Sequence, residues 1–125
     1  MYKPFLRTAA LLGALSVAAG AFGAHALKQL LSPEKLQVYE TAVRYQFYHG
    51  FALLAAGIIF ASIPVSLIKW AGRLFIAGII LFSGSLYALV FLPDQFKWVG
   101  AITPLGGAAF IAGWCCLFLS FNKRA

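Results

Sequence analysis

The chain has 125 residues, of which 62% are hydrophobic and only 10% are charged, and its formal net charge is +7. Soluble domains carry about 25% charged residues, so this composition places the chain among membrane proteins. Lys and Arg beside membrane spans normally set orientation and contact anionic lipid. Because no basic run is interleaved with aromatic residues, the positive charge does not indicate a nucleic-acid-binding protein.

Four stretches are long and apolar enough to cross a bilayer, and they leave little of the chain over. A hydrocarbon core about 30 Å thick needs roughly 20 apolar residues at a rise of about 1.5 Å per residue. We therefore predict an all-α fold, an integral membrane four-helix bundle that forms a single domain over residues 1–125. The spans are expected at about residues 5–27, 45–63, 74–92 and 99–121.

The second helix is expected to begin well before its span. Ser32 and Pro33 are typical of an N-cap and the first turn, and Glu34 complements the positive end of the helix dipole. No Gly or Pro follows until Gly50, so an amphipathic helical extension over residues 33–44 is predicted. The sequence leaves open whether this extension lies on the membrane surface or continues the span.

Prolines mark the later boundaries. Pro64 ends the second span and Pro93 ends the third. Thr103 and Pro104 predict a cap and a first turn for a fourth helix that begins late, which would leave residues 96–102 irregular.

Both termini and the middle loop are expected on one side of the membrane. The other side receives all three acidic residues, Glu34, Glu40 and Asp94. Lys and Arg are enriched in cytoplasmic segments, so both termini are predicted to be cytoplasmic. The basic residues of that side are Lys3, Arg7, Lys69, Arg73, Lys123 and Arg124.

Small residues recur at helical spacing and predict close contact between helices. Lipid is as apolar as leucine, so helices in a bilayer associate through close packing and hydrogen bonds. Ser16, Gly20 and Ala24 recur every four residues in the first span. The residues expected at helix contacts are Gly20, Gly23, Gly84, Gly106 and Gly113.

Polar side chains gather in the outer half of the predicted bundle, whereas the cytoplasmic half is apolar. This follows from placing each side chain by its depth along antiparallel spans. Gln46 and Tyr48 belong to this polar half, together with the residues expected to line a site if there is one. Those residues are His25, Arg44, Tyr45, His49, Ser83, Ser85, Tyr87 and Thr103.

His25 and His49 lie at similar depth on antiparallel helices and are expected to be able to face each other. Ionisable residues inside a membrane suggest a proton-handling or metal site, a small-ligand cavity or a quinone headgroup pocket. Two opposed histidines would also suit bis-histidine haem ligation. The alternative is that these side chains only hydrogen-bond across helices. No cofactor is predicted, although haem or a metal at the histidines stays open.

Several motifs occur in a characteristic order: GAFGAHAL at residues 20–27, YQFYH at 45–49, FSGSLY at 82–87, TPLGG at 103–107 and GW at 113–114. Together they resemble a small four-span membrane protein family of unknown function related to transmembrane protein 256. The resemblance covers essentially the whole chain. It implies a multi-pass protein of the cell inner (plasma) membrane with no established activity, and its motifs contain most of the polar residues named above.

No serine–histidine–acid arrangement, paired carboxylates or phosphate-binding loop can be assembled, so an enzyme is not expected. We predict a non-enzymatic membrane protein that packs against a partner in the lipid bilayer, either as an accessory subunit or as a homo-oligomer. The alternative is the handling of a small ligand, proton or metal at the outer-half site lined by the two histidines.

Overall fold

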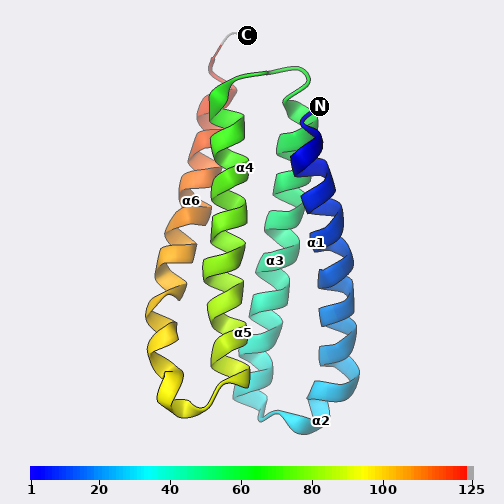
Figure 1. The fold of residues 1–125 in the computed structure, drawn as a ribbon, viewed down its shortest axis with the longest axis vertical. Coiled ribbons are helices and arrows are strands. Elements are labelled where there is room, and N and C mark those ends of the chain that lie inside the picture. The colour runs from blue at the N-terminus through cyan, green and yellow to red at the C-terminus, as the bar shows by residue number, and fades with distance from the viewer. Residues whose placement is uncertain (124–125) are drawn as a thin grey trace.

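The structure is a computed structural model that describes residues 1–123, and within this range all regular structure is helical. Four long helical segments run side by side (Figure 1). The predicted all-α bundle is confirmed. The segments are α1 (Lys3–Phe22), which continues through the π-helix η1 (Gly23–Leu27) into α2 (Lys28–Leu30); α3 (Pro33–Ile59); α4 (Ser66–Gly78), which continues through the π-helix η2 (Ile79–Ser83) into α5 (Gly84–Phe91); and the 3₁₀-helix η3 (Asp94–Ala101), which leads into α6 (Thr103–Ser120).

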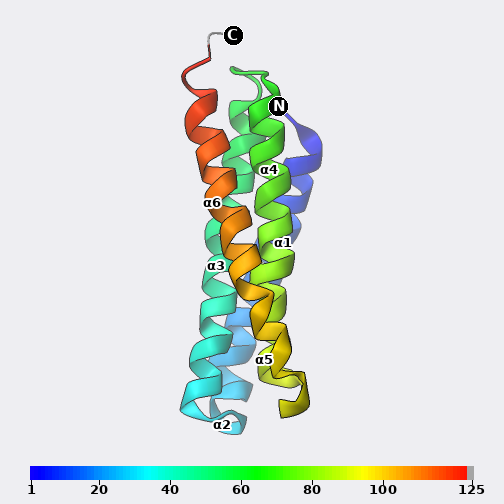
Figure 2. The ribbon, with the colours of Figure 1, turned by 90° about the vertical axis from the view of Figure 1, so that its left-hand side faces the viewer.

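α3 and α4 form the middle of the bundle. α1 packs mainly on α3, and α6 packs mainly on α4. Figure 2 shows α6 in front of the central pair and α1 behind it. We call the end with both termini and the α3–α4 connection the terminal end, and the end with α2 and η3 the distal end (Figure 1). The predicted grouping of the termini with the middle loop is therefore observed.

Three of these segments are long and apolar enough to cross a membrane: Lys3–Leu30, Ser66–Phe91 and Asp94–Ser120. α3 is not among them, although residues 45–63 were expected to form a span. α3 runs along the bundle beside the others (Figure 1), and its Gln46 and His49 are buried against them. An average over consecutive residues counts these inward-facing polar groups as if lipid surrounded them, which lowers the apparent hydropathy of α3.

Two predicted helix starts are observed, with different capping. Ser32 Oγ accepts a hydrogen bond from the Lys35 backbone N–H at 3.2 Å, as expected for an N-cap. α3 is continuous from Pro33, so residues 33–44 extend the second helix. α6 begins at Thr103, but Thr103 does not cap it, because its hydroxyl bonds to Ser85 instead. Helix boundaries also shift, since α3 ends at Ile59 and α4 begins already at Ser66.

Aromatic rings packed over glycines hold the helices together. A Cβ on Gly72 would collide with the ring of Phe5, and one on Gly78 with the ring of Phe110. Phe75, which is fully buried, lies against Gly113, where a Cβ would be 2.8 Å from the ring. Each pair joins two different helical segments, so the missing side chain of the glycine sets the distance between backbones.

The predicted packing glycines differ in how closely they are packed. A Cβ on Gly23 would be 2.5 Å from Tyr39, and one on Gly106 would collide with the Phe82 backbone, so these two glycines lie in close contacts, as Gly113 does. Gly20 makes an ordinary contact, since its Cβ would lie 3.8 Å from Val43. The prediction for Gly84 is wrong, because Gly84 is exposed and a Cβ there would meet nothing within 4 Å.

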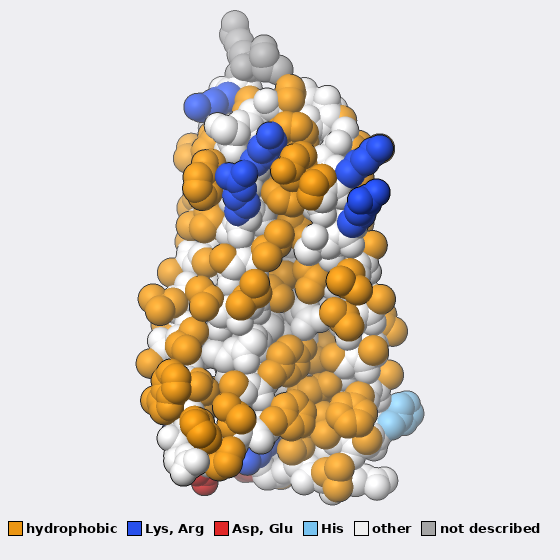
Figure 3. Space-filling view, in the orientation of Figure 1, with side chains coloured by type: hydrophobic (Ala, Val, Ile, Leu, Met, Phe, Trp, Pro, Cys, Tyr) orange, Lys and Arg blue, Asp and Glu red, His pale blue; other side chains and the backbone are white. Residues whose placement is uncertain are grey.

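Charge separates between the two ends of the bundle. Figure 3 shows most of the Lys and Arg side chains on this face near the terminal end, and the acidic side chains with a further basic one at the distal end. At the terminal end the Lys69 ammonium lies 5.2 Å from the ring centroids of both Tyr2 and Phe60. Arg124, which was counted in the predicted charge bias, lies outside the described residues.

The two kinds of glycine predict opposite responses to the same substitution. Gly106→Ala should lower the free energy of unfolding by about 1–3 kcal/mol, because the backbone of Phe82 cannot move aside for the new methyl group. Gly84→Ala should leave it unchanged or raise it by up to about 1 kcal/mol through helix propensity. Unfolding in mild detergent measures both. Equal effects of the two substitutions would contradict the packing assignment.

Candidate functional site

The buried face of α3 carries two polar side chains near the middle of the bundle. Ala42, Gln46, His49 and Leu53 recur at helical spacing and are all buried. Gln46 is 7% exposed and His49 is 4% exposed. Buried polar side chains in an apolar environment need partners, so the surrounding helices must supply them.

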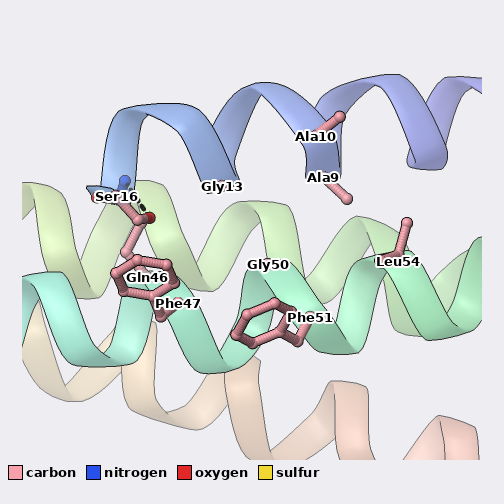
Figure 4. A pocket seen from close by; sticks show the side chains of 9 residues that line it. All are labelled: Ala9, Ala10, Gly13, Ser16, Gln46, Phe47, Gly50, Phe51 and Leu54. Carbon is pink, nitrogen blue, oxygen red and sulfur yellow. Dashed lines mark hydrogen bonds between the residues drawn. The ribbon is translucent and has the colours of Figure 1, made fainter. Parts of the chain in front are cut away.

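Gln46 connects three helical segments. Its Nε2 donates to Ser16 Oγ of α1 at 2.8 Å, a bond that is visible in Figure 4. Its Oε1 accepts a hydrogen bond from the Tyr87 hydroxyl of α5, also at 2.8 Å. Ser16 is completely buried. The amide therefore fixes α1 and α5 to the same level of α3.

Two serines in and after η2 extend these connections. Ser83 Oγ donates to the Ala42 carbonyl of α3 at 2.7 Å. Ser85 Oγ donates to the Phe82 carbonyl at 2.9 Å and lies 2.5 Å from the hydroxyl of Thr103 at the start of α6. Because the Ser85 proton is already used, Thr103 is the donor in that last bond. Through these contacts η2 is joined to α3, and α5 to α6.

His49 has both ring nitrogens engaged. Its Nδ1 lies 2.8 Å from the Tyr45 carbonyl, and its Nε2 accepts from the indole N–H of Trp114 at 3.1 Å. A carbonyl only accepts and an indole only donates, so this geometry assigns a neutral imidazole with its proton on Nδ1. The ring also stacks on Phe110, with centroids 3.5 Å apart and an interplanar angle of 10°. His49 is a fixed part of the α3–α6 contact.

His25 and Arg44 lie apart from this interior cluster. The expectation that His25 and His49 face each other is wrong, because His25 is exposed in η1 while His49 is buried beside α6. This pair therefore does not offer two ligands to one iron or metal ion. Within residues 1–123, moreover, no group of three or more His, Cys, Asp or Glu is placed to hold a metal. Arg44 is also exposed, on the surface of α3.

The structure brings all six of the other predicted residues toward the interior of the bundle. These are Tyr45, His49, Ser83, Ser85, Tyr87 and Thr103. The sequence reasoning missed three members of the cluster. Ser16 was assigned to packing, Gln46 was noted as polar but not placed in the site, and Trp114 appeared only in a motif. An amide within an apolar helix was a usable signal for Gln46, because it requires partners.

The cluster is closed. Among the described residues, no buried side-chain nitrogen or oxygen lacks a hydrogen-bond partner. The two cysteines do not belong to it, since Cys115 is exposed and Cys116 is half-buried on α6. The arrangement supports hydrogen bonding between helices.

Open volume lies between helices at the surface. The α3–α6 cleft has a volume of about 370 Å³ and is lined by Tyr45, His49, Phe82, Gly107, Phe110, Ile111 and Trp114. The α1–α3 groove has two sections, which share Phe47. The first section, shown in Figure 4, has a volume of about 190 Å³ and runs between Ala9–Ser16 of α1 and Gln46–Leu54 of α3. The second has about 280 Å³ and reaches Glu40 and Arg44.

The Gln46 connection predicts a measurable coupling. Tyr87→Phe removes the donor to Gln46 Oε1 and should lower the free energy of unfolding by about 0.5–2 kcal/mol, the range seen for hydrogen bonds between membrane helices. Combined with Gln46→Leu, the loss should be smaller than the sum of the two single losses. Unfolding of the single and double variants tests this. Tyr48→Phe, on the exposed side of α3, should change nothing, and strict additivity would contradict the connection.

Comparisons with known proteins agree with this architecture. Residues 19–107 match a family described as "Protein of unknown function (DUF423)". A UPF0382 membrane protein of Staphylococcus aureus (strain bovine RF122 / ET3-1) is 47% identical over 123 residues, which is 98% of each chain. A UPF0382 membrane protein of Staphylococcus haemolyticus is 46% identical over 121 residues, or 97% of each chain. No solved structure matches.

The matched range runs from the end of α1 to the first turn of α6 and contains both π-helices, Gln46 and Tyr87, whereas Ser16 precedes it. The resemblance drawn from the motifs is confirmed, since the relatives are likewise membrane proteins without an assigned activity. The chain belongs to the DUF423 family of membrane proteins.

Proposed function

We propose that the protein is a non-enzymatic accessory protein of the cell membrane that binds another membrane protein laterally. One observation carries this proposal: the buried polar groups are bonded to one another, whereas open volume lies between helices at the surface of the bundle. The interior hydrogen bonds therefore serve contacts between the helices. A hollow between lipid-facing helices offers a shaped surface to a neighbour in the membrane.

The α3–α6 cleft is the surface proposed for this contact. Its walls carry the rings of Tyr45, Phe82, Phe110 and Trp114, and aromatic side chains dominate the energetics of protein interfaces. Its floor is open at Gly107, where a Cβ would lie 4.0 Å from the nearest atom of Phe82. A side chain or helix edge of a partner would fill this space.

The orientation with both termini in the cytoplasm is part of the proposal. It is supported by the Lys and Arg side chains that gather at the terminal end (Figure 3). A reporter that works only in the cytoplasm should be active when it is fused to the C-terminus. Activity of a reporter that works only outside the cell would contradict this orientation.

The lateral-binding proposal is tested by filling the cleft. Gly107→Leu should shift the protein, extracted in mild detergent, from a larger complex to its own monomer mass on native electrophoresis. The cause is that the leucine occupies the space that the partner would fill. Gly84→Leu is a matched control, because Gly84 is also a helical glycine with open space but lines neither the cleft nor the groove. A monomeric parent protein, or a complex that survives Gly107→Leu, would contradict the proposal.

A lipid-soluble planar small molecule is the second candidate for the same cleft. The volume of about 370 Å³ falls within the range of roughly 300–1,000 Å³ typical of ligand pockets. The stacked rings of His49 and Phe110 provide a flat aromatic surface beside it. Native mass and absorbance spectra of the same preparation separate the candidates: a small bound mass that Gly107→Leu removes supports the ligand, and a bound protein supports the accessory role.

A further inference from the structure

The α1–α3 groove lies on the opposite side of α3 from the α3–α6 cleft and shares no lining residue with it. A role for this groove is therefore independent of the function proposed for the cleft. The two sections share Phe47 as a lining residue and follow one another along the line between the helices. Along α3 the lining of the groove extends from Leu54, five residues before the end of the helix at Ile59, to Glu40, seven residues after its start at Pro33.

The length of the apolar part matches one leaflet of a bilayer. Arg44 and Leu54 are about 15 Å apart along the axis of α3 at a rise of about 1.5 Å per residue. A hydrocarbon core about 30 Å thick gives each leaflet about 15 Å. The apolar part of the groove is thus about as long as the part of a leaflet that one acyl chain occupies.

The width of the groove suits a chain and excludes a helix. Its floor is made by Gly13 and Gly50, and a Cβ on Gly13 would meet nothing within 4 Å. Phe47 and Phe51 form one wall, with stacked rings 5.9 Å apart, as Figure 4 shows from close by. A helix with its side chains is at least about 10 Å across, whereas this section holds only about 190 Å³.

The distal section of the groove carries two opposite charges in a fixed order. Arg44 lines it, and Glu40 lines it one helical turn closer to the distal end. Both side chains are exposed. In a phospholipid the phosphate lies next to the acyl region and the headgroup amine lies farther out. Arg44 is therefore placed for the phosphate, and Glu40 for an amine beyond it.

We propose that the α1–α3 groove binds a zwitterionic phospholipid, with its phosphate at Arg44, its ammonium group at Glu40 and one acyl chain over Gly13 beside Phe47 and Phe51. The guanidinium supplies charge-assisted hydrogen bonds at the membrane interface. The small residues of α1 leave the space that the chain fills. Glu40 makes the site favour an amine-bearing headgroup over a purely anionic one.

The test measures lipid retention by native mass spectrometry. The full-length protein in mild detergent is mixed with equal amounts of phosphatidylethanolamine and phosphatidylglycerol that carry identical acyl chains. The parent protein should retain phosphatidylethanolamine in preference to phosphatidylglycerol. Gly13→Leu should reduce retention about tenfold, since a lost contact of about 1.4 kcal/mol corresponds to that factor. Gly84→Leu, the same change outside the groove, should retain lipid like the parent.

The two charges give independent readouts, because both side chains are exposed and their loss should not unfold the bundle. Arg44→Gln should weaken both lipids about tenfold through loss of a charge-assisted hydrogen bond. Glu40→Gln should abolish the preference between the lipids without loss of phosphatidylglycerol. The unfolding free energies of all variants serve as the check on folding.

Three results would overturn the proposal. The first is equal retention of the two lipids by the parent. The second is unchanged retention by Gly13→Leu or Arg44→Gln in a folded protein. The third is a dimer of this chain that Gly13→Leu disrupts while lipid retention stays the same, which would assign the groove to a second copy.

Discussion

Close approach of backbones at glycines is the constraint on which the structure depends. In a bilayer an apolar surface gains nothing by leaving lipid, so contact between helices must come from dispersion and hydrogen bonds. Phe5 over Gly72 and Phe110 over Gly78 supply the first of these, and each joins a peripheral helix to central α4. Since α4 then contacts α3 along its length, the four segments form one unit.

Polar side chains supply the second kind of contact, the hydrogen bonds between helices. The largest aromatic contacts lie toward the terminal end and middle of the bundle, where the core contains Phe5, Phe75 and Phe110. Toward the distal end, hydrogen bonds from Gln46 and Ser83 take a larger share of the contacts. A polar side chain in a membrane helix costs free energy unless it is paired, so the pairing restricts how α1, α5 and α6 can be arranged around α3.

The sequence predicted how far along the bundle each residue lies, but not to which side of its helix each side chain points. Hydropathy and the positions of proline, glycine and capping residues predicted the long helices, the cap at Ser32 and the polar distal half. All of these features depend on position along the chain. Which way a side chain points depends also on helix geometry. Each π-helix widens a turn by one residue and so rotates the next part of the helix by about 100° relative to an uninterrupted α-helix. His25 lies inside η1 and Gly84 directly follows η2, and these are the positions where the predicted facing was wrong.

Two glycines, Gly13 and Gly107, are not required for close contact between helices. Gly13 and Gly107 each lie beside a neighbour that is needed: Gly13 is one turn from buried Ser16, and Gly107 is next to tightly packed Gly106. A helix favours almost any other residue over glycine by up to about 1 kcal/mol, so an open glycine lowers helix stability without improving contact inside the bundle. Both instead deepen a hollow at the surface of the bundle. The proposed occupants of the cleft and the groove would offset this cost at Gly107 and Gly13. Gly84 is equally open but lines neither hollow, so the two proposals depend on the hollows and not on the glycines alone.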